Sequence, residues 1–261
     1  MRTTDMVDEL FRGPETELPA GVRLATAKRG GVTVTRVEIT REGLARPRGR
    51  YVTLEMPSVS VLDERDTDVI ETGAAELRAL LPPEGPVLVL GIGNRRVTAD
   101  ALGPRTAQKI LVTMGPQHTL PVRGIRPVAA LAPGVSGDTG LTLRQLAAAM
   151  VDAVRPAALI CVDSLCSAEA ARLGRTIQFS DTGLHPADAR HAWHLDAAAL
   201  GVPVIAAGIP TLMDADEGAD LVLTPRALDS VIAHGSALLA GILNRALQPR
   251  LSVAQLCWLT G

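Results

Sequence analysis

One stretch, residues 86–104, constrains the fold more than any other part of the chain. An apolar run at 87–90 has the length of one buried strand, and after a glycine-rich turn the chain presents Asp100. A second apolar run, at 158–162, ends in Asp163. Because side chains at the carboxyl ends of parallel strands gather in one crevice, we expect the two carboxylates to face each other there.

Downstream of residue 66, the apolar patterns predict alternating helices and strands. Strands are predicted at 87–91, 125–131, 158–162, 176–180 and 202–207, and helices at 66–81, 103–114, 143–154 and 227–247. This alternation is typical of a mainly parallel sheet flanked by helices. We therefore expect a single α/β domain over residues 21–261.

The first part of the chain follows a different pattern. Two alternating runs, 32–39 and 51–56, predict a short antiparallel strand pair that adds an edge or a flap. Residues 1–20 are charged and polar and contain two prolines, which predicts a mobile arm or a short propeptide-like segment. If the strand at 51–56 is an edge, an extended peptide could pair with it.

Composition argues against several classes of function. The formal net charge is −2, so no direct nucleic-acid partner and no attraction to an anionic membrane are expected. The first residues lack the apolar segment of a signal peptide, and no apolar run reaches the ~18 residues that a membrane span requires. The three cysteines are too few for a disulfide scaffold. We expect a soluble cytoplasmic protein.

Glycines follow the strand at 87–91 in a pattern that partly matches a dinucleotide-binding fingerprint. Gly91 and Gly93 have the required spacing, but Arg96 stands where the third glycine belongs. The glycines more simply permit a tight turn. Together with Asn94 they form one candidate loop whose backbone N–H groups could stabilise an oxyanion.

A second glycine-rich loop, with Gly134, Thr139 and Gly140, is another candidate for binding a substrate backbone or an oxyanion. Its alternative role is to cap the helix that follows. The aspartates also have structural alternatives, because Asp100 could cap a helix and Asp163 could bind a loop amide. Each signal is weak when it is taken alone.

The residues do not indicate a metal site or another cofactor. His191 and His194 could present two imidazoles, but no acidic or cysteine ligand accompanies them at metal-site spacing. Cys161 and Cys166 flank Asp163 and are interpreted as small packing residues. No cofactor is predicted, and a divalent metal ion is left open.

Taken together, the motifs resemble those of the germination proteases of spore-forming bacteria. The matching stretches are 2–6, 49–55, 91–94, 97–104, 111–113, 124–128, 132–135, 139–140, 162–165, 176–183, 201–206, 208–211 and Asp214. They cover most of the chain, and the central motif that ends in ADALGP at 99–104 is very specific.

The resemblance implies an α/β fold similar to that of the hydrogenase maturation endopeptidases. It also implies an endopeptidase that degrades small acid-soluble spore proteins in the spore core when germination begins. The two family aspartates fall on Asp100 and Asp163. The family is made as a zymogen, and the matching processing site lies between Asp5 and Met6. In the maturation endopeptidases the matching carboxylates help to hold a metal, but the histidine that completes that site has no clear counterpart here.

The chain departs from the family pattern in two places. The segment after Asp214 passes almost directly to 221–229, so a family subdomain is absent and the family's tetramer does not carry over. A homo-oligomer is left open. The glycine-rich run of the family is replaced by 187–192, so the conformation of that loop does not carry over either.

Our hypothesis for the mechanism is a pair of aspartates that share one proton and activate water. Two alternatives are kept. One is a metal-dependent maturation-type endopeptidase, and the other is a peptide-binding member of the family that has lost catalysis.

Overall fold

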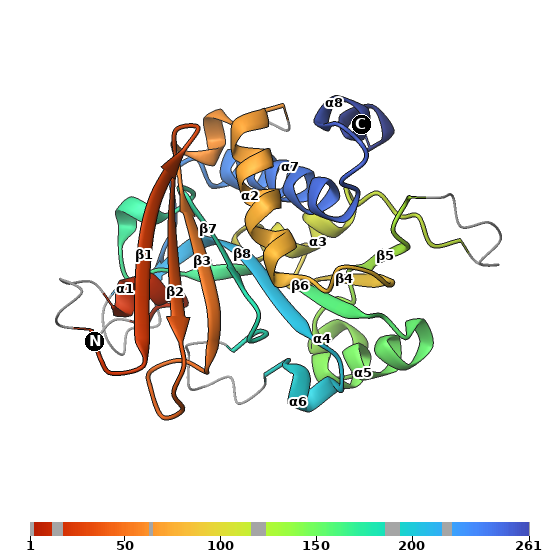
Figure 1. Ribbon diagram of the computed structural model, residues 1–261, viewed down its shortest axis with the longest axis horizontal. Helices are drawn as coiled ribbons and strands as arrows, with labels where there is room; N and C mark the ends of the chain where they lie inside the picture. The colour runs from red at the N-terminus through yellow and green to blue at the C-terminus, as the bar shows by residue number, and fades with distance from the viewer. Residues whose placement is uncertain are drawn as a thin grey trace.

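The computed structural model describes residues 3–11, 18–62, 65–115, 124–185, 194–215 and 221–260. Within these ranges, nine strands form one mixed sheet in the order β1-β2-β3-β7-β8-β6-β4-β5, and β9 pairs with β8 (Figure 1). The strands are β1 Val22–Arg29, β2 Val32–Ile39, β3 Gly49–Glu55, β4 Val87–Gly91, β5 Val128–Leu131, β6 Ala158–Cys166, β7 Thr176–Ser180, β8 Val204–Asp214 and β9 Val222–Leu223. The helices are α1 Val7–Leu10, α2 Thr67–Leu80, α3 Leu102–Ala107, α4 Ser136–Thr139, α5 Leu143–Val154, α6 Ala197–Leu200, α7 Leu228–Leu247 and α8 Val253–Thr260.

One half of the sheet is parallel, as the alternation of strands and helices predicts. Strand β4 pairs in parallel with both β5 and β6, and β6 pairs in parallel with β8. The chain passes from β4 outward to β5 and then returns across β4 to β6. The order of strands therefore reverses between β4 and β6, and ligands of open α/β sheets bind at such a reversal.

The other half is antiparallel and contains a strand that the sequence patterns miss. Strand β3 pairs with β2 on one side and with β7 on the other. The expectation that residues 51–56 form an edge open to a peptide is therefore wrong. The edge is β1, which was missed because only Val22 of its eight residues is buried, so its sequence shows no clear alternation.

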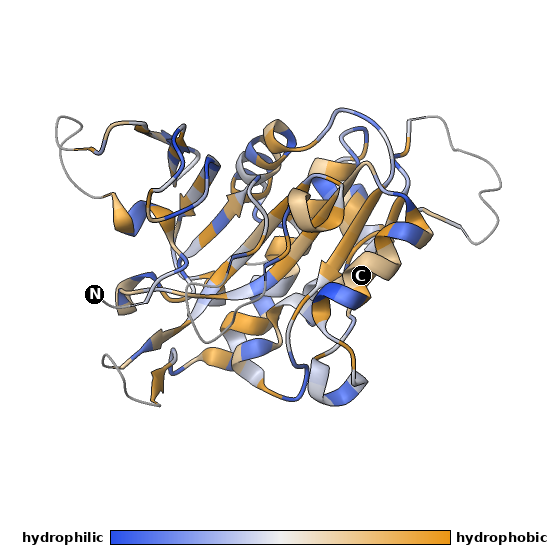
Figure 2. Cartoon of the chain, turned by 90° about the horizontal axis from the view of Figure 1, so that it is seen from below, coloured by the Kyte–Doolittle hydropathy of each residue, from blue (hydrophilic) through white to orange (hydrophobic). Residues whose placement is uncertain are grey.

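Helices cover the two faces of the sheet unequally. Helices α2, α3 and α7 lie over one face, and their apolar side chains join those of the central strands in the largest core cluster. Helices α5 and α6 cover the opposite face of the parallel half, where a smaller cluster forms (Figure 1). Figure 2 shows that the central strands are among the most hydrophobic parts of the chain. Such apolar strands are typical of a sheet that is buried on both faces.

Helix α7 is long and apolar enough to match a membrane span by composition alone. However, 67% of the relevant window is buried inside the protein. Its buried residues, among them Ile232, Leu239 and Ile242, pack into the largest core cluster. We interpret α7 as the core helix of a globular domain.

Several element boundaries differ from the prediction, and two of these differences have a clear physical reason. Helix α3 ends at Ala107 instead of 114, because the Asn244 side-chain amide binds the Lys109 carbonyl and the Leu111 N–H, which a continuing helix would use. Strand β6 extends to Cys166, past the end of its apolar run, because its backbone continues to pair with β8. Asp163 therefore lies inside a strand.

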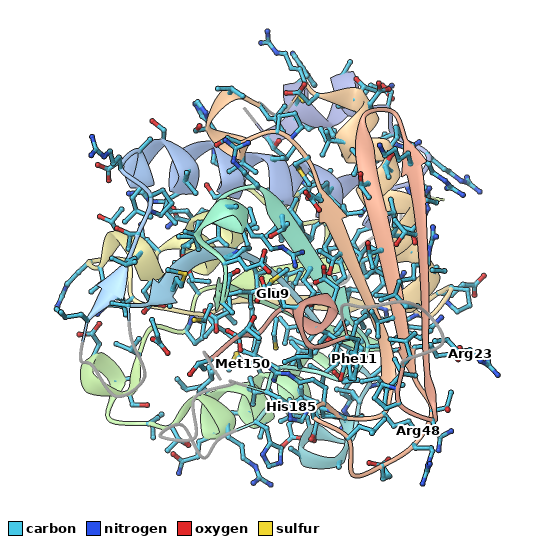
Figure 3. The ribbon with its side chains drawn as sticks, turned by 90° about the vertical axis from the view of Figure 1, so that its left-hand side faces the viewer. Glu9, Phe11, Arg23, Arg48, Met150 and His185 are labelled. Atoms are coloured by element: carbon cyan, nitrogen blue, oxygen red, sulfur yellow. The ribbon has the colours of Figure 1, made fainter. Side chains whose placement is uncertain are left out.

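The beginning of the chain packs against the domain, where the sequence patterns led us to expect a mobile arm over 1–20. Met6 has no exposed surface, and Val7 and Phe11 belong to a third apolar cluster with β1, β2 and β3. Figure 3 labels Glu9 in α1 and Phe11 directly after it, beside the strands of the antiparallel half. Residues 3–11 therefore form part of the folded domain.

Candidate active site

Asp100 lies beyond the carboxyl end of β4, in the short 3-10 turn Thr98–Asp100. Its Oδ2 accepts a hydrogen bond of 2.7 Å from the backbone N–H of Asn94. Gly93 has a φ of +121°, and a Cβ there would collide with the Asp100 carbonyl group. The turn therefore requires glycine at this position. Asp100 makes no side-chain cap to α3, so the capping alternative does not account for it.

Helix α3 begins very close to the sheet, directly after Asp100. A Cβ on Gly91 would collide with the carbonyl of Gly103, and a Cβ on Gly103 would collide with the carbonyls of Ile92 and Val162. The Ile92 N–H donates to the Val162 carbonyl over 2.8 Å, which joins the end of β4 to β6. Gly91 therefore supports the position of the Asp100 turn and does not itself line the cleft.

Asp163 projects from β6, next to the point where β4 ends. Its Oδ1 accepts a hydrogen bond of 2.8 Å from the N–H of Ser164. Asp163 and Asp100 line the same cleft, which has a volume of about 560 Å³. The structure thus brings together the two carboxylates that the sequence singled out, and their catalytic role stays a prediction.

The environment of both carboxyl groups favours the protonated form. Burial raises the pKa of Asp100, although the hydrogen bond from Asn94 partly opposes this effect. Burial raises the pKa of Asp163 well above its ordinary value, and the negative charge of Asp100 raises it further. Two carboxyl groups that disfavour each other's ionisation tend to hold one proton between them.

A third carboxylate, Asp5, also lines this cleft. The Asp5 N–H donates to the Cys166 carbonyl, and the Cys166 N–H donates to Asp5 Oδ2, each over 2.8 Å. The charge of Asp5 contributes to the raised pKa of Asp163. The start of the chain is therefore docked directly beside the aspartate pair.

Gln178 of β7 holds the same segment through its side-chain amide. Its Oε1 accepts from the Val7 N–H over 2.7 Å, and its Nε2 donates to the Asp5 carbonyl over 2.8 Å. Gln178 pairs with Gly208 of β8, which in turn pairs with Asp163 of β6. Residues that lie opposite one another in a sheet project to the same face, so Gln178 and Asp163 belong to one row with only a glycine between them.

Gln178 and Arg46 are functional candidates that the sequence reasoning missed. A signal for Gln178 was present, since an amide stands between the apolar Ile177 and Phe179 of a strand. Arg46 donates to the carbonyls of Thr4, over 2.5 Å, and His185, over 2.8 Å. No pattern in the sequence connects Arg46 to these partners, which belong to distant segments.

The remaining loop residues divide into those in the cleft and those outside it. Gly93 and Gly134 line the cleft wall. Thr139 ends α4 and bonds to carbonyls of its own loop, and Gly140 takes the left-handed conformation that ends this helix. Thr139 and Gly140 therefore have a structural role in ending α4, but the helix that follows, α5, is capped by Thr142, so the expected capping role of this loop is wrong for these two residues. Asn94 acts through its backbone N–H, which Asp100 already occupies.

Within the part of the chain that the structure describes, no group of three His, Cys, Asp or Glu side chains is arranged to hold a metal ion. His194 stacks on His185 with a ring separation of 5.6 Å, and both lie 3.7–3.8 Å from Asp196. His191, the other predicted imidazole, lies outside the described residues. The absence of a cofactor stays a prediction.

Comparisons with known proteins decide the family. The family model for germination protease matches residues 5–217. A germination protease of Clostridium perfringens strain SM101 is 32% identical over an alignment of 278 positions, which covers 84% of this chain and 86% of that protein. This chain belongs to the germination protease family. It is accordingly a peptidase by family.

One further relative and one solved structure are also similar to this chain. A germination protease of Bacillus velezensis is 38% identical over 222 residues, which cover 79% of this chain and 58% of that protein. Among solved structures, the [NiFe] hydrogenase maturation protease HycI of Thermococcus kodakarensis is similar over 66% of this chain and 98% of its own, with 17% identity and a TM-score of 0.43.

Proposed function

We propose that this germination protease homologue is an endopeptidase that cleaves small acid-soluble spore proteins in the spore core when germination begins. In this proposal Asp100 and Asp163 form the catalytic pair. One observation carries it: the two carboxyl groups line one cleft at the reversal point in the parallel half of the sheet, each with a raised pKa. Perturbed carboxyl groups in a cleft are candidates for acid–base chemistry.

The environments of the two groups suggest their roles. Asp163 has its pKa raised by burial and also by the charge of Asp100, so it keeps the shared proton. Asp100 then acts as the general base that takes a proton from water. Asp163 donates its proton to the leaving amine. Each transfer by a positioned carboxyl group is typically worth ~10²–10⁴ in rate.

Self-processing between Asp5 and Met6 is the second part of the proposal. Asp5 lines the cleft that contains both aspartates, and its backbone is held by Cys166 and Gln178. A peptide bond in this position lies on the same face of the sheet as Asp163. The chain's own start would thus be a first substrate.

The test is incubation of the purified protein with a small acid-soluble spore protein, followed by mass spectrometry of the fragments. Asp100→Asn and Asp163→Asn should each lower cleavage by ~10²–10⁴-fold while the melting temperature shows that the variant is folded. Full cleavage by either variant would remove that aspartate from the mechanism. Loss of activity on adding a chelator, restored by a divalent metal, would instead favour the metal-dependent alternative.

A further inference from the structure

The side chain of Gln178 contacts the peptide bond that the proposed self-processing would cleave. Its Nε2 lies 2.8 Å from the carbonyl oxygen of Asp5, and that carbonyl belongs to the Asp5–Met6 bond. Its Oε1 accepts from the N–H of Val7 over 2.7 Å, on the other side of Met6. Because one partner is an acceptor and the other a donor, this orientation of the amide is the one that satisfies both.

Gln178 is held firmly enough to act on that carbonyl. Its side chain is buried, with 8% of the residue exposed, in a strand flanked by β3 and β8. Its neighbour in the row is Gly208, and a Cβ there would meet the Asp163 carbonyl and the Leu165 side chain. The glycine thus keeps the space between the amide and Asp163 free of a side chain. Donors that are fixed before reaction give the largest stabilisation of a developing charge.

The backbone N–H groups that the sequence suggested for this task are less suitable. The Asn94 N–H is already used by Asp100, over 2.7 Å. Thr139 and Gly140 are engaged in ending α4. Among the described residues that line the cleft, Gln178 has a side-chain donor already placed on a carbonyl beside the aspartate pair.

We propose that Gln178 is a catalytic residue, the side-chain donor that polarises the scissile carbonyl and stabilises its oxyanion. This inference rests on the proposed function. Water attacks the Asp5 carbonyl carbon while Asp100 takes one of its protons, and the carbonyl oxygen gains the negative charge beside Gln178 Nε2. The carbon–nitrogen bond to Met6 then breaks as the nitrogen takes the proton of Asp163. The products are a new carboxyl group on Asp5 and a free amine on Met6.

The same amide would serve a protein substrate in trans, with the substrate carbonyl in the place of the Asp5 carbonyl. This use predicts an effect on turnover rather than on binding, because the donor acts where charge develops. A residue that only anchors the start of the chain would change self-processing through its position, but in molecules already cut between Asp5 and Met6 it would leave the turnover of an added substrate unaltered.

The experiment compares Gln178→Met, Gln178→Glu and the full-length wild type. Gln178→Met has a similar shape without polar atoms, and Gln178→Glu keeps an acceptor for Val7 but loses the donor to Asp5. Self-processing is followed by intact mass, and the kcat and KM for a small acid-soluble spore protein are expressed per molecule that has been cut. We expect both variants to lower kcat by ~10²–10³-fold, with KM changed by less than about threefold.

Thr53→Val is the matched control. Thr53 lies next to Gln178 in the same row and donates to Asp8 over 3.1 Å, so it anchors α1 without touching the Asp5 carbonyl. Its kcat should remain within about twofold of the wild type. Melting curves of all variants separate misfolding from loss of chemistry.

The outcomes are distinguishable. No cleavage of any substrate by the wild type would overturn both the proposed function and the role of Gln178. Wild-type kcat in a folded Gln178→Met, or a raised KM with unchanged kcat, would overturn the role of Gln178 alone. If Gln178→Met does not fold, the kcat of Gln178→Glu decides.

Discussion

The two halves of the sheet do different work at the same cleft. The parallel half, β5-β4-β6-β8, is rich in aliphatic residues, and its glycines allow α3 to pack closely against β4 and β6. It positions Asp163 within β6 and Asp100 in the turn that follows β4. The antiparallel half contributes polar side chains, above all Gln178, that hold the start of the chain. The comparison suggests that the two acid–base carboxylates come from one half of the fold, whereas the groups that hold the peptide, including the proposed oxyanion donor Gln178, come from the other. Mutations in the parallel half should then change the positions of the two carboxylates, and mutations in the antiparallel half should change the docking of residues 3–11.

The largest effect is expected where the start of the chain docks, in Arg172→Met. The Arg172 side chain is 5% exposed and lies 2.8 Å from Asp8 Oδ2 and 3.4 Å from Glu9 Oε1, without an aligned hydrogen bond. Removing the cation leaves buried carboxylates unpaired, which typically costs about 3–5 kcal/mol. Hydrogen exchange of residues 3–11 should speed up accordingly, while β4 and β6 keep their protection. Equal loosening of both regions would contradict the division between the two halves.

The next effect is expected in the parallel half, in Gly91→Ala. The added Cβ would collide with the Gly103 carbonyl, so α3 must move away from the sheet. Overpacking of this kind typically costs about 1–3 kcal/mol of unfolding free energy. Because Asp100 lies between the two elements that separate, activity should fall together with stability. Denaturant unfolding and kcat measured on one preparation test this link, and an unchanged kcat would break it.

Asp163→Asn is expected to raise the stability of the protein, by less than the two preceding substitutions lower it. The pKa of Asp163 is higher in the folded chain than in the unfolded chain, where it is about 3.9. The wild type therefore loses stability as the pH rises from the pKa of the unfolded chain through that of the folded chain. The variant carries no such ionisation. It should match the wild type at low pH and exceed it at neutral pH, by on the order of 0.5–2 kcal/mol. Melting curves between pH 3 and pH 8 measure the difference, and a gain that shrank with rising pH would be evidence against the raised pKa.

The parallel half was predictable because its residues obey simple patterns. Strand β4 and helix α5 have the predicted bounds, since an apolar run and a capped periodic segment each carry their own boundaries. Asp100 and Asp163 could be singled out because each follows such a run. Their meeting at one cleft followed from the rule for strand ends, and the structure brings them together there.

The antiparallel half resisted prediction because its contacts are long-range. Gln178 and Val7 are 171 residues apart, and no local period connects an amide in a strand to a backbone N–H at the start of the chain. Strand β1 exposes most of its residues, so it lacks the alternation that marks a strand. The charged residues of the first segment looked solvated, but Asp8 and Glu9 are buried against Arg172. Their burial depends on a partner that only the folded chain supplies.

The smallest expected effects come from a matched pair of substitutions, one in each half. Thr211 of β8 donates to the Ala99 carbonyl over 2.9 Å, in the turn that carries Asp100, and Thr53 of β3 donates to Asp8 over 3.1 Å. Both residues are buried, and Thr→Val keeps the shape while removing one hydrogen bond. Each variant should lose about 1 kcal/mol of unfolding free energy.

The two variants should nevertheless differ in activity. Without its bond to Thr211, the turn that carries Asp100 gains freedom, and misplacing a general base lowers kcat. We expect kcat of Thr211→Val to fall by roughly tenfold and kcat of Thr53→Val to stay within about twofold of the wild type. Steady-state kinetics on one spore-protein substrate, with denaturant unfolding of the same samples, measures both quantities. If the two variants lost activity equally, positioning of the catalytic group would depend on the whole sheet and the separation between its halves would fail.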